Sequence, residues 1–170
     1  MSDHISRYEY DHRGDDLQIH PMKWYKFLIY FALFAGALIS LSNALQYLTG
    51  SIYLSEGLTE ADVDALYDLH GGFKVLDMIY GLTCIGSAVL DLITRSRLRH
   101  FHRTAPAFVL AVPVYNVFCS SMYTILSCGI ARLDVFEFLP QVIGSILGVA
   151  IYIWPSYIYF NKRRNLFVNE

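Results

Sequence analysis

Residues 71–103 read GGFKVLDMIYGLTCIGSAVLDLITRSRLRHFHR and decide the fold. The first part is apolar and long enough to cross the hydrocarbon core of a bilayer, which takes about 20 residues. The second part is basic, and basic connections stay on the cytoplasmic side of a membrane. The segment therefore predicts one membrane span and its direction. It also contains Asp77, which lies well inside the apolar run.

Composition also indicates a membrane protein. Apolar residues make up 55% of the chain and charged residues 16%, whereas soluble domains average about 45–50% and about 25%. The net charge of -2 carries little information. Because most of the 170 residues are assigned to spans, we expect no separate soluble domain with a sizeable core.

Apolar runs divide the chain into two tails and one membrane domain. Residues 1–21 are polar and mixed in charge, so we expect a loosely held cytoplasmic tail without a signal peptide or a metal site. Residues 22–164 form the membrane domain and residues 165–170 a second tail. The predicted spans cover residues 27–48, 73–93, 108–128 and 139–160.

Basic residues predict the orientation of these spans. If both termini are cytoplasmic, 11 of the 13 Lys and Arg residues lie inside and only Lys74 and Arg132 lie outside. Short connections join antiparallel neighbours. The sequence therefore predicts an all-α fold, a four-transmembrane-helix antiparallel bundle with both termini in the cytoplasm.

The connection after the first span is acidic and contains neither Lys nor Arg, so we expect it to face outward. Thr59 and Asp62 have the spacing of a capping box, and Gly71 has the chemistry of a helix end. These signals predict a short interfacial helix whose apolar face rests on the membrane surface or on the bundle. The alternative, a calcium loop, lacks the alternating oxygen ligands.

Polar residues from all four spans fall at a comparable depth in the outer half of the membrane. They are Asn43, Lys74, Asp77, Tyr80, Ser120, Ser121, Thr124 and Gln141. A carboxylate inside a span costs about 2.5–3.5 kcal/mol on insertion scales, so it is by default a hypothesis for a functional site. Two interpretations of Asp77 stay open. Its carboxylate accepts hydrogen bonds from Lys74, Tyr80 or Asn43 in a structural cluster, or it serves a small outward-facing site.

The second span ends at a basic connection. Asp91 lies four residues before Arg95, a spacing that predicts an ion pair at the membrane interface. The basic residues of the connection are Arg95, Arg97, Arg99 and Arg103. They set the topology, and they could also bind anionic lipid head groups, each cation near the surface contributing about 1 kcal/mol.

Small residues recur at four-residue spacing in the first and last spans. Gly36 and Ser40 form one such pair, and Gly144 and Gly148 form the other. Residues at this spacing share one face of a helix and permit the close approach of a second helix. The two pairs therefore predict helix packing surfaces.

The sequence contains no catalytic pattern. Cys84, Cys119 and Cys128 form no CxxC pair, which a quinone-linked disulfide oxidoreductase needs. Paired carboxylates, an HExxH motif, a phosphate loop and a nucleophile motif do not occur either. We therefore expect no enzyme activity, no cofactor and no bound metal.

Part of the chain resembles a family of uncharacterised small four-span integral membrane proteins of anaerobic Gram-positive bacteria. The resemblance covers residues 22–123 and is carried by MKWYKFLIYFALFAGALISLSNALQYLTG, GGFKVLDMIYGL and TRSRLRHFHR. Its most specific element is the pattern of Lys74, Asp77, Tyr80 and Gly81. Some relatives carry a zinc ribbon before the first span, whereas this tail has no cysteine. The resemblance implies the plasma membrane of a bacterium and brings no activity.

Two functions follow from these observations. The leading hypothesis is a non-enzymatic interaction or assembly protein that associates with itself or with another membrane protein along the Gly36 and Gly144 faces. The alternative is a small transporter or sensor in which Asp77 responds to protons or cations. The lipid bilayer, with anionic lipids at its cytoplasmic face, is the expected surrounding, and no nucleic-acid partner is expected.

Overall fold

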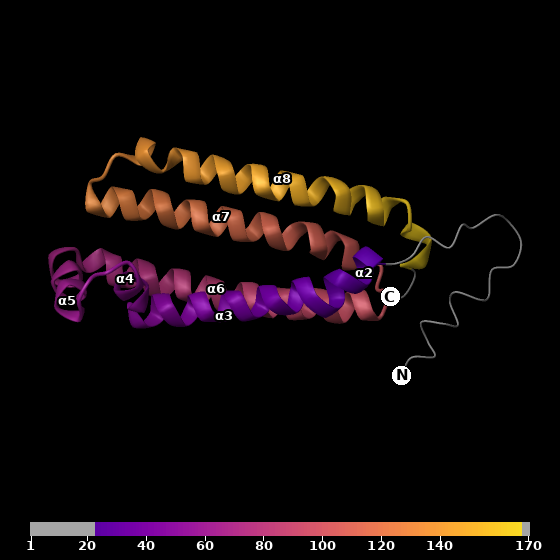
Figure 1. Cartoon of the computed structure of the whole chain (residues 1–170), viewed down its shortest axis with the longest axis horizontal. Coiled ribbons are helices and arrows are strands. Elements are labelled where there is room, and N and C mark those ends of the chain that lie inside the picture. The colour runs from indigo at the N-terminus through magenta and orange to yellow at the C-terminus, as the bar shows by residue number, and fades with distance from the viewer. Residues whose placement is uncertain (1–22, 168–170) are drawn as a thin grey trace, which may run out of the picture.

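A computed structural model describes residues 23–167 of the chain (Figure 1). The elements are α2 (Lys23–Phe27), η1 (Leu28–Ala32), α3 (Leu33–Thr49), α4 (Ser51–Ser55), α5 (Glu60–Leu69), α6 (Gly71–Arg99), α7 (Ala105–Ala131), η2 (Val135–Phe138), α8 (Leu139–Asn161) and η3 (Arg164–Leu166). This part of the chain has no strand. The predicted tail of residues 1–21 and residues 168–170 lie outside the described residues.

Four helices are long and apolar enough to cross a membrane. They are Lys23–Thr49, which joins α2, η1 and α3, then Gly71–Arg99, Ala105–Ala131 and Val135–Asn161. The shortest has 27 residues. At about 1.5 Å per residue it is about 40 Å long, which exceeds the hydrocarbon core of about 30 Å. Each predicted span lies within one of these helices, which confirms an all-α fold with four apolar helices.

The long helices form two layers. α3 and α6 lie side by side in one layer, α7 and α8 form the other, and α6 also packs against α7 (Figure 1). The α3–α6 contact requires a glycine, because a Cβ atom at Gly81 would lie 2.8 Å from Leu48 Cγ. α8 is the least covered helix. In the most apolar 18-residue stretch of Val135–Asn161, no residue is buried. In the corresponding stretch of α6, 39% of the residues are buried.

An apolar core closes the end of the bundle at which α2 begins and α8 finishes. Tyr25, Leu28, Leu98, Val109 and Phe160 are buried there and come from all four long helices. The Tyr25 hydroxyl donates a hydrogen bond to the Leu98 carbonyl. These contacts join the two layers firmly at this end.

The first span contains one π-helical turn, Leu28–Ala32. The backbone N–H of Leu33 bonds to the Leu28 carbonyl in this wide turn, and such turns disturb the regular helix bonding around them. The Ile29 carbonyl accepts a hydrogen bond from Arg95 Nε at 3.0 Å. The Arg95 guanidinium also lies 5.5 Å from the centroid of the Phe34 ring. Arg95 is thus engaged by the first span and not by Asp91, so the predicted ion pair is wrong.

The connection after the first span contains α4 and α5. The capping box is confirmed, since Thr59 N donates to Asp62 Oδ2 at 2.9 Å and Asp62 N donates to Thr59 Oγ1 at 3.3 Å. Hydrogen bonds from the Thr59 hydroxyl, at 2.6 Å, and from the Thr59 backbone N–H lower the pKa of the Asp62 carboxyl. Gly71 does not end α5. It begins α6, and His70 lies between the two helices. Val63 is buried, so the apolar face of α5 packs on the bundle.

Candidate functional site

The Asp77 carboxylate lies at the centre of a tyrosine cluster near the α5 end of the bundle. Only 1% of Asp77 is exposed. Asp77 Oδ2 accepts hydrogen bonds from the Tyr53 and Tyr67 hydroxyls, both at 2.9 Å. Asp77 Oδ1 accepts one from the Tyr123 hydroxyl at 2.8 Å. Three donors therefore compensate the loss of hydration, and hydrogen bonds to a charged group are about twice as strong as neutral ones.

Four elements meet at this carboxylate. Asp77 belongs to α6, Tyr53 to α4, Tyr67 to α5 and Tyr123 to α7. The short helices α4 and α5 fold back over the end of the bundle and bring two of the hydroxyls to α6. Burial raises the pKa of the Tyr53 and Tyr67 hydroxyls, so both stay protonated and keep donating. The cluster therefore fastens the first connection to the long helices α6 and α7.

Aromatic rings surround the same site. The Tyr80 and Tyr123 rings stack with centroids 4.5 Å apart. The Tyr47 ring packs edge-on against both, with its centroid 4.7 Å from that of Tyr80 and 5.1 Å from that of Tyr123. Tyr80 thus contributes its ring to the cluster and does not donate to the carboxylate. Such aromatic pairs add about 0.5–1.5 kcal/mol each beyond their buried area.

The other predicted members of the polar cluster are distributed differently. Lys74 is exposed, and its Nζ lies 6.0 Å from the centroid of the Tyr67 ring. Asn43 and Ser120 line a separate cavity together with Tyr80. Thr124 Oγ1 donates to the Ser120 carbonyl at 3.0 Å, so this hydroxyl serves its own helix.

Ser121 and Gln141 also lie apart from the carboxylate. Ser121 Oγ is buried and forms no hydrogen bond within the described part of the chain. Gln141 is exposed on α8, and its backbone carbonyl accepts from Ser145 Oγ at 2.9 Å. Sequence reasoning missed the three tyrosines that hold Asp77. The available signal was the need of a buried carboxylate for donors, with Tyr53 and Tyr67 on the predicted outer connection.

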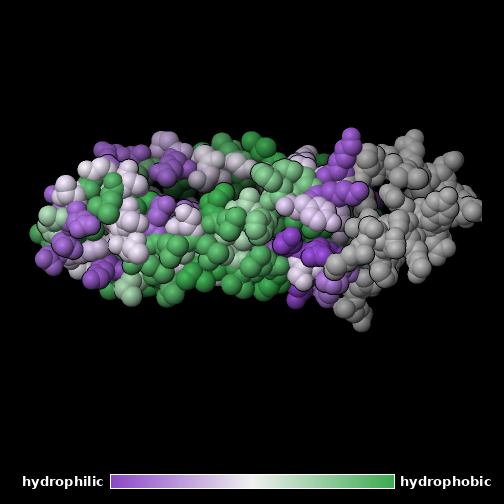
Figure 2. Space-filling view, turned by 60° about the horizontal axis from the view of Figure 1, so that its bottom comes forward, coloured by the Kyte–Doolittle hydropathy of each residue, from purple (hydrophilic) through white to green (hydrophobic). Residues whose placement is uncertain are grey.

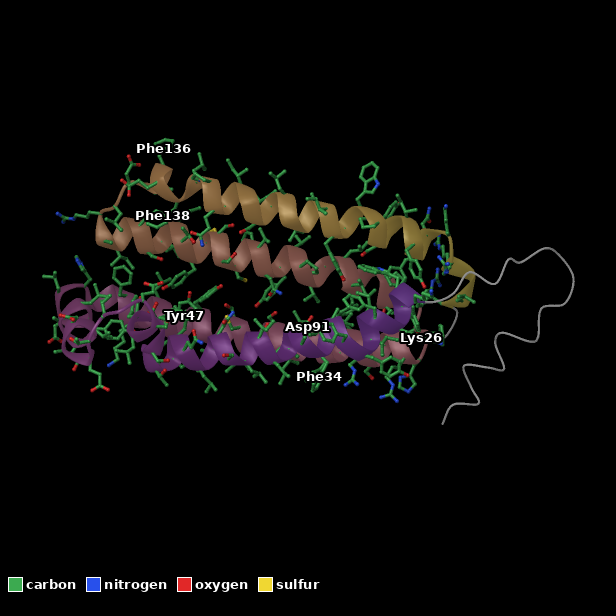
Figure 3. All side chains as sticks on the ribbon, viewed as in Figure 1. Lys26, Phe34, Tyr47, Asp91, Phe136 and Phe138 are labelled. Carbon is green, nitrogen blue, oxygen red and sulfur yellow. The ribbon has the colours of Figure 1, made fainter. Side chains whose placement is uncertain are left out.

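A second buried carboxylate, Asp91, lies further along α6. It is 6% exposed, and at about 1.5 Å per residue it is about 21 Å from Asp77 along the helix axis. Among residues 23–167 its side chain forms no hydrogen bond and no ion pair. Figure 3 labels Asp91 on the α3–α6 layer, away from both ends of these helices. The carboxylate packs against Gly36, where a Cβ atom would lie 3.0 Å from Asp91 Oδ2.

Asp91 lines a cavity of about 320 Å³ between α3, α6 and α7. The residues around this cavity are mixed. Polar side chains, among them Ser40, Asn43, Ser87, Asn116 and Ser120, lie beside apolar and aromatic ones. Its lining contains no Lys, Arg or His from the described part of the chain. A volume of this size falls at the lower end of the range of small-molecule sites, about 300–1,000 Å³. The arrangement is a cavity of mixed polar and apolar lining that contains one carboxylate, beside the middle of α6.

The predicted packing glycines have two different environments. Gly36 is used inside the chain, where it makes room for Asp91, and Ser40 Oγ donates to Ser87 Oγ at 3.4 Å. A Cβ atom at Gly144 or at Gly148 would meet nothing within 4 Å. The Gly36 face is therefore an internal contact, and the α8 face is open.

The four arginines of the predicted basic connection differ in their contacts and in their exposure. Arg97 donates to Thr104 Oγ1, and its guanidinium lies 4.4 Å from the centroid of the Phe108 ring. Arg95 is held by Ile29, as described above. Arg99 and Arg103 are exposed. Two of the four side chains are thus directed to partners within the chain.

The His, Cys, Asp and Glu side chains of the described residues form no metal centre. Within residues 23–167 no three of them are placed to hold one ion. Cys84, Cys119 and Cys128 are free thiols, and Cys84 and Cys128 are buried.

Comparisons with protein-family models, with curated proteins and with solved structures found no match to this chain. The class of the protein therefore rests on its own features. Four helices long and apolar enough to cross a bilayer are compatible with a multi-pass membrane protein.

Proposed function

We propose that this chain is a multi-pass protein of a bacterial plasma membrane that acts by interaction, without catalysis, and has both termini in the cytoplasm. Figure 2 supports the membrane location, since apolar residues cover the middle of the face shown and hydrophilic residues gather toward its two ends. The strong excess of Lys and Arg on one side of the predicted spans supports the orientation. The resemblance to four-span proteins of anaerobic Gram-positive bacteria agrees with this location.

The partner in this proposal is a second copy of the chain, bound along α8. The observation that carries it is the open surface at Gly144 and Gly148, where a Cβ atom would meet nothing within 4 Å. Two glycines of the other spans are different, since Gly36 faces Asp91 and Gly81 faces Leu48. The α8 pair thus has the spacing of a helix contact without a contact inside the chain.

The surroundings of this pair suit a symmetric contact. Ile143, Leu147 and Ile151 are apolar and exposed, at 47%, 57% and 74%. They recur at four-residue spacing. Ile143 and Leu147 directly precede the two glycines, and Ile151 follows Gly148 by three positions, so these side chains flank the glycine pair along α8. Two copies crossing at the glycines would bring their backbones close and pack these side chains around the crossing point. Close van der Waals packing is the main attraction between helices in lipid.

Anionic lipids are the second proposed partner, at the basic connection. Arg99 and Arg103 are exposed and available, whereas Arg95 and Arg97 bind within the chain. Two cations near the surface would contribute about 2 kcal/mol together. We therefore expect a weak preference for anionic lipid and no tight lipid site.

The alternative function, a transporter or sensor that uses Asp77, gains no support from the contacts of that residue. Both carboxylate oxygens accept hydrogen bonds from tyrosines of other elements. Asp77 also lies outside the lining of the cavity that contains Asp91. These contacts favour a structural role.

Self-association can be tested by counting subunits of the labelled protein in native membrane fragments. The wild type should give a dimer, and Gly144→Ile with Gly148→Ile should give mainly monomer. Ala150→Ile is the matched control, because residue 150 is also exposed on α8 but points away from the glycine pair. A wild type that is monomeric at all densities, or glycine variants that dimerise as well as the control, would refute the proposal.

A further inference from the structure

The Asp91 carboxyl group has no hydrogen-bond or ion-pair partner among the described residues around its cavity. Asp91 is only 6% exposed, and no hydrogen bond or ion pair satisfies it among residues 23–167. Its neighbour Arg95 donates to the Ile29 carbonyl. A buried ionised carboxylate is costly unless it is paired. Such a carboxyl is neutralised by a proton, compensated by a group other than the described side chains, or retained at a cost for a task.

Two of the hydroxyls around this cavity, those of Thr83 and Ser120, direct their protons to backbone carbonyls. Thr83 Oγ1 donates to the Tyr80 carbonyl at 2.7 Å, and Ser120 Oγ donates to the Val117 carbonyl at 3.1 Å. A hydroxyl has one proton and two lone pairs. These two side chains therefore have acceptor lone pairs left over and no proton to offer to Asp91.

The remaining polar groups add further oxygen atoms. Ser40 Oγ donates to Ser87 Oγ at 3.4 Å, so the Ser40 proton is used within the cavity and the Ser87 hydroxyl keeps its own. Asn43 and Asn116 add side-chain amides, each of which carries one oxygen and one NH2 group, to the lining. The cavity thus combines one carboxylate with several neutral oxygens and no basic side chain of the described residues. This donor set is the kind that hard cations prefer.

We propose that the cavity between α3, α6 and α7 binds a small monovalent cation, with Asp91 as its counter-charge and hydroxyl and amide oxygens as its neutral ligands. Charge balance favours one positive charge, because the described lining contains a single carboxylate. The volume of about 320 Å³ accommodates either an alkali ion with some of its water or a small organic ammonium ion. The Tyr80 and Tyr115 side chains in the lining could face an ammonium group. This inference is independent of self-association along α8.

Thermal unfolding of the full-length protein in nanodiscs tests the proposal. NaCl, KCl and tetramethylammonium chloride are each titrated over about three decades of concentration, because a ligand that binds only the folded state raises the melting temperature with its concentration. The wild type should melt at progressively higher temperature with at least one of the cations. An effect of Na⁺ or K⁺ alone indicates an inorganic ion, and an effect of tetramethylammonium alone indicates an organic ammonium ion. Both results support the proposal.

Matched variants separate this effect from a general salt effect. Asp91→Asn should lose the cation-dependent rise. Asp77→Asn and Asp68→Asn should keep it, since Asp77 is buried on the same helix but held by tyrosines, and Asp68 is exposed. Equilibrium dialysis with radioactive Na⁺ or tetramethylammonium should show the same loss directly. A flat wild-type response, or a rise that Asp91→Asn retains, would overturn the proposal.

A second variant covers the case in which Asp91→Asn does not fold. Gly36→Ala keeps the charge but places a methyl group 3.0 Å from Asp91 Oδ2. The carboxylate must then shift within the cavity, so the apparent cation affinity should fall several-fold. Gly129→Ala is the control, because its Cβ would meet nothing within 4 Å. Equal cation affinity in both alanine variants would count against the site.

Discussion

Replacing Tyr123 by phenylalanine removes one hydroxyl and leaves its ring in place. Tyr123 is the only described donor to Asp77 Oδ1, at 2.8 Å, whereas Oδ2 has two donors. The variant therefore leaves one oxygen of a carboxylate that is 1% exposed without a donor. A net hydrogen bond to a charged group contributes about 1.5–3 kcal/mol. We expect the free energy of unfolding to fall by about 2–3 kcal/mol, near the upper part of that range.

This loss can be measured as a shift of the melting temperature in nanodiscs. A change of 1 kcal/mol shifts the melting temperature of a chain of this size by about 2–4 °C, so Tyr123→Phe should melt about 5–10 °C lower. Tyr53→Phe should cost less, because Tyr67 still donates to Oδ2. Tyr30→Phe is the control, since Tyr30 is 61% exposed. A Tyr123→Phe variant as stable as Tyr30→Phe, or more stable than Tyr53→Phe, would refute the structural role of the cluster.

Three further predictions concern the α3–α6 contact, the α5 cap and Arg95. Gly81→Ala should destabilise the protein by about 1–3 kcal/mol through overpacking against Leu48, and thermal unfolding beside Gly129→Ala would measure it. The folded pKa of Asp62 lies below its ordinary value of 3.8, so its contribution to stability is complete above that value and is lost as the pH falls below it; the protection of the α5 amides against hydrogen exchange, relative to the intrinsic rate at each pH, should therefore fall there, and less so in Asp62→Asn. Arg95→Gln should cost about 1.5–3 kcal/mol by removing the bond to Ile29, and a loss that vanishes in high salt would instead indicate an ion pair.

The long apolar runs predict the four helices well, because hydrophobic length is a local property of the sequence. The capping box at Thr59 and Asp62 is local too, and it forms as predicted. Asp77 was found for the same reason, as an ionisable residue in an apolar run. Its partners were not, since they depend on how α4 and α5 fold over the bundle. No spacing in the sequence encodes that tertiary contact.

The Asp91–Arg95 pair shows where local reasoning fails. The spacing of four residues favours an ion pair on a regular helix. The π-helical turn of the first span offers the Ile29 carbonyl to Arg95, and this partner lies on a different helix. Likewise, Gly36 and Gly144 are each followed four positions later by another small residue, a spacing that suits helix packing in both cases. Only the structure shows that Gly36 already contacts Asp91 within the chain.

The two buried aspartates of α6 are expected to have opposite roles. Asp77 is held by three tyrosine hydroxyls, and Asp91 has no hydrogen-bond partner among the described residues. The most direct test is the thermal stability of wild type, Asp77→Asn and Asp91→Asn in nanodiscs without added alkali or ammonium salts. Residues kept for a task are often retained at a cost in stability. We predict that Asp77→Asn loses about 2–4 kcal/mol, by weakening the bonds to its donors, whereas Asp91→Asn is as stable as the wild type or more stable. Equal losses in both variants, or a larger loss in Asp91→Asn, would contradict this division of roles.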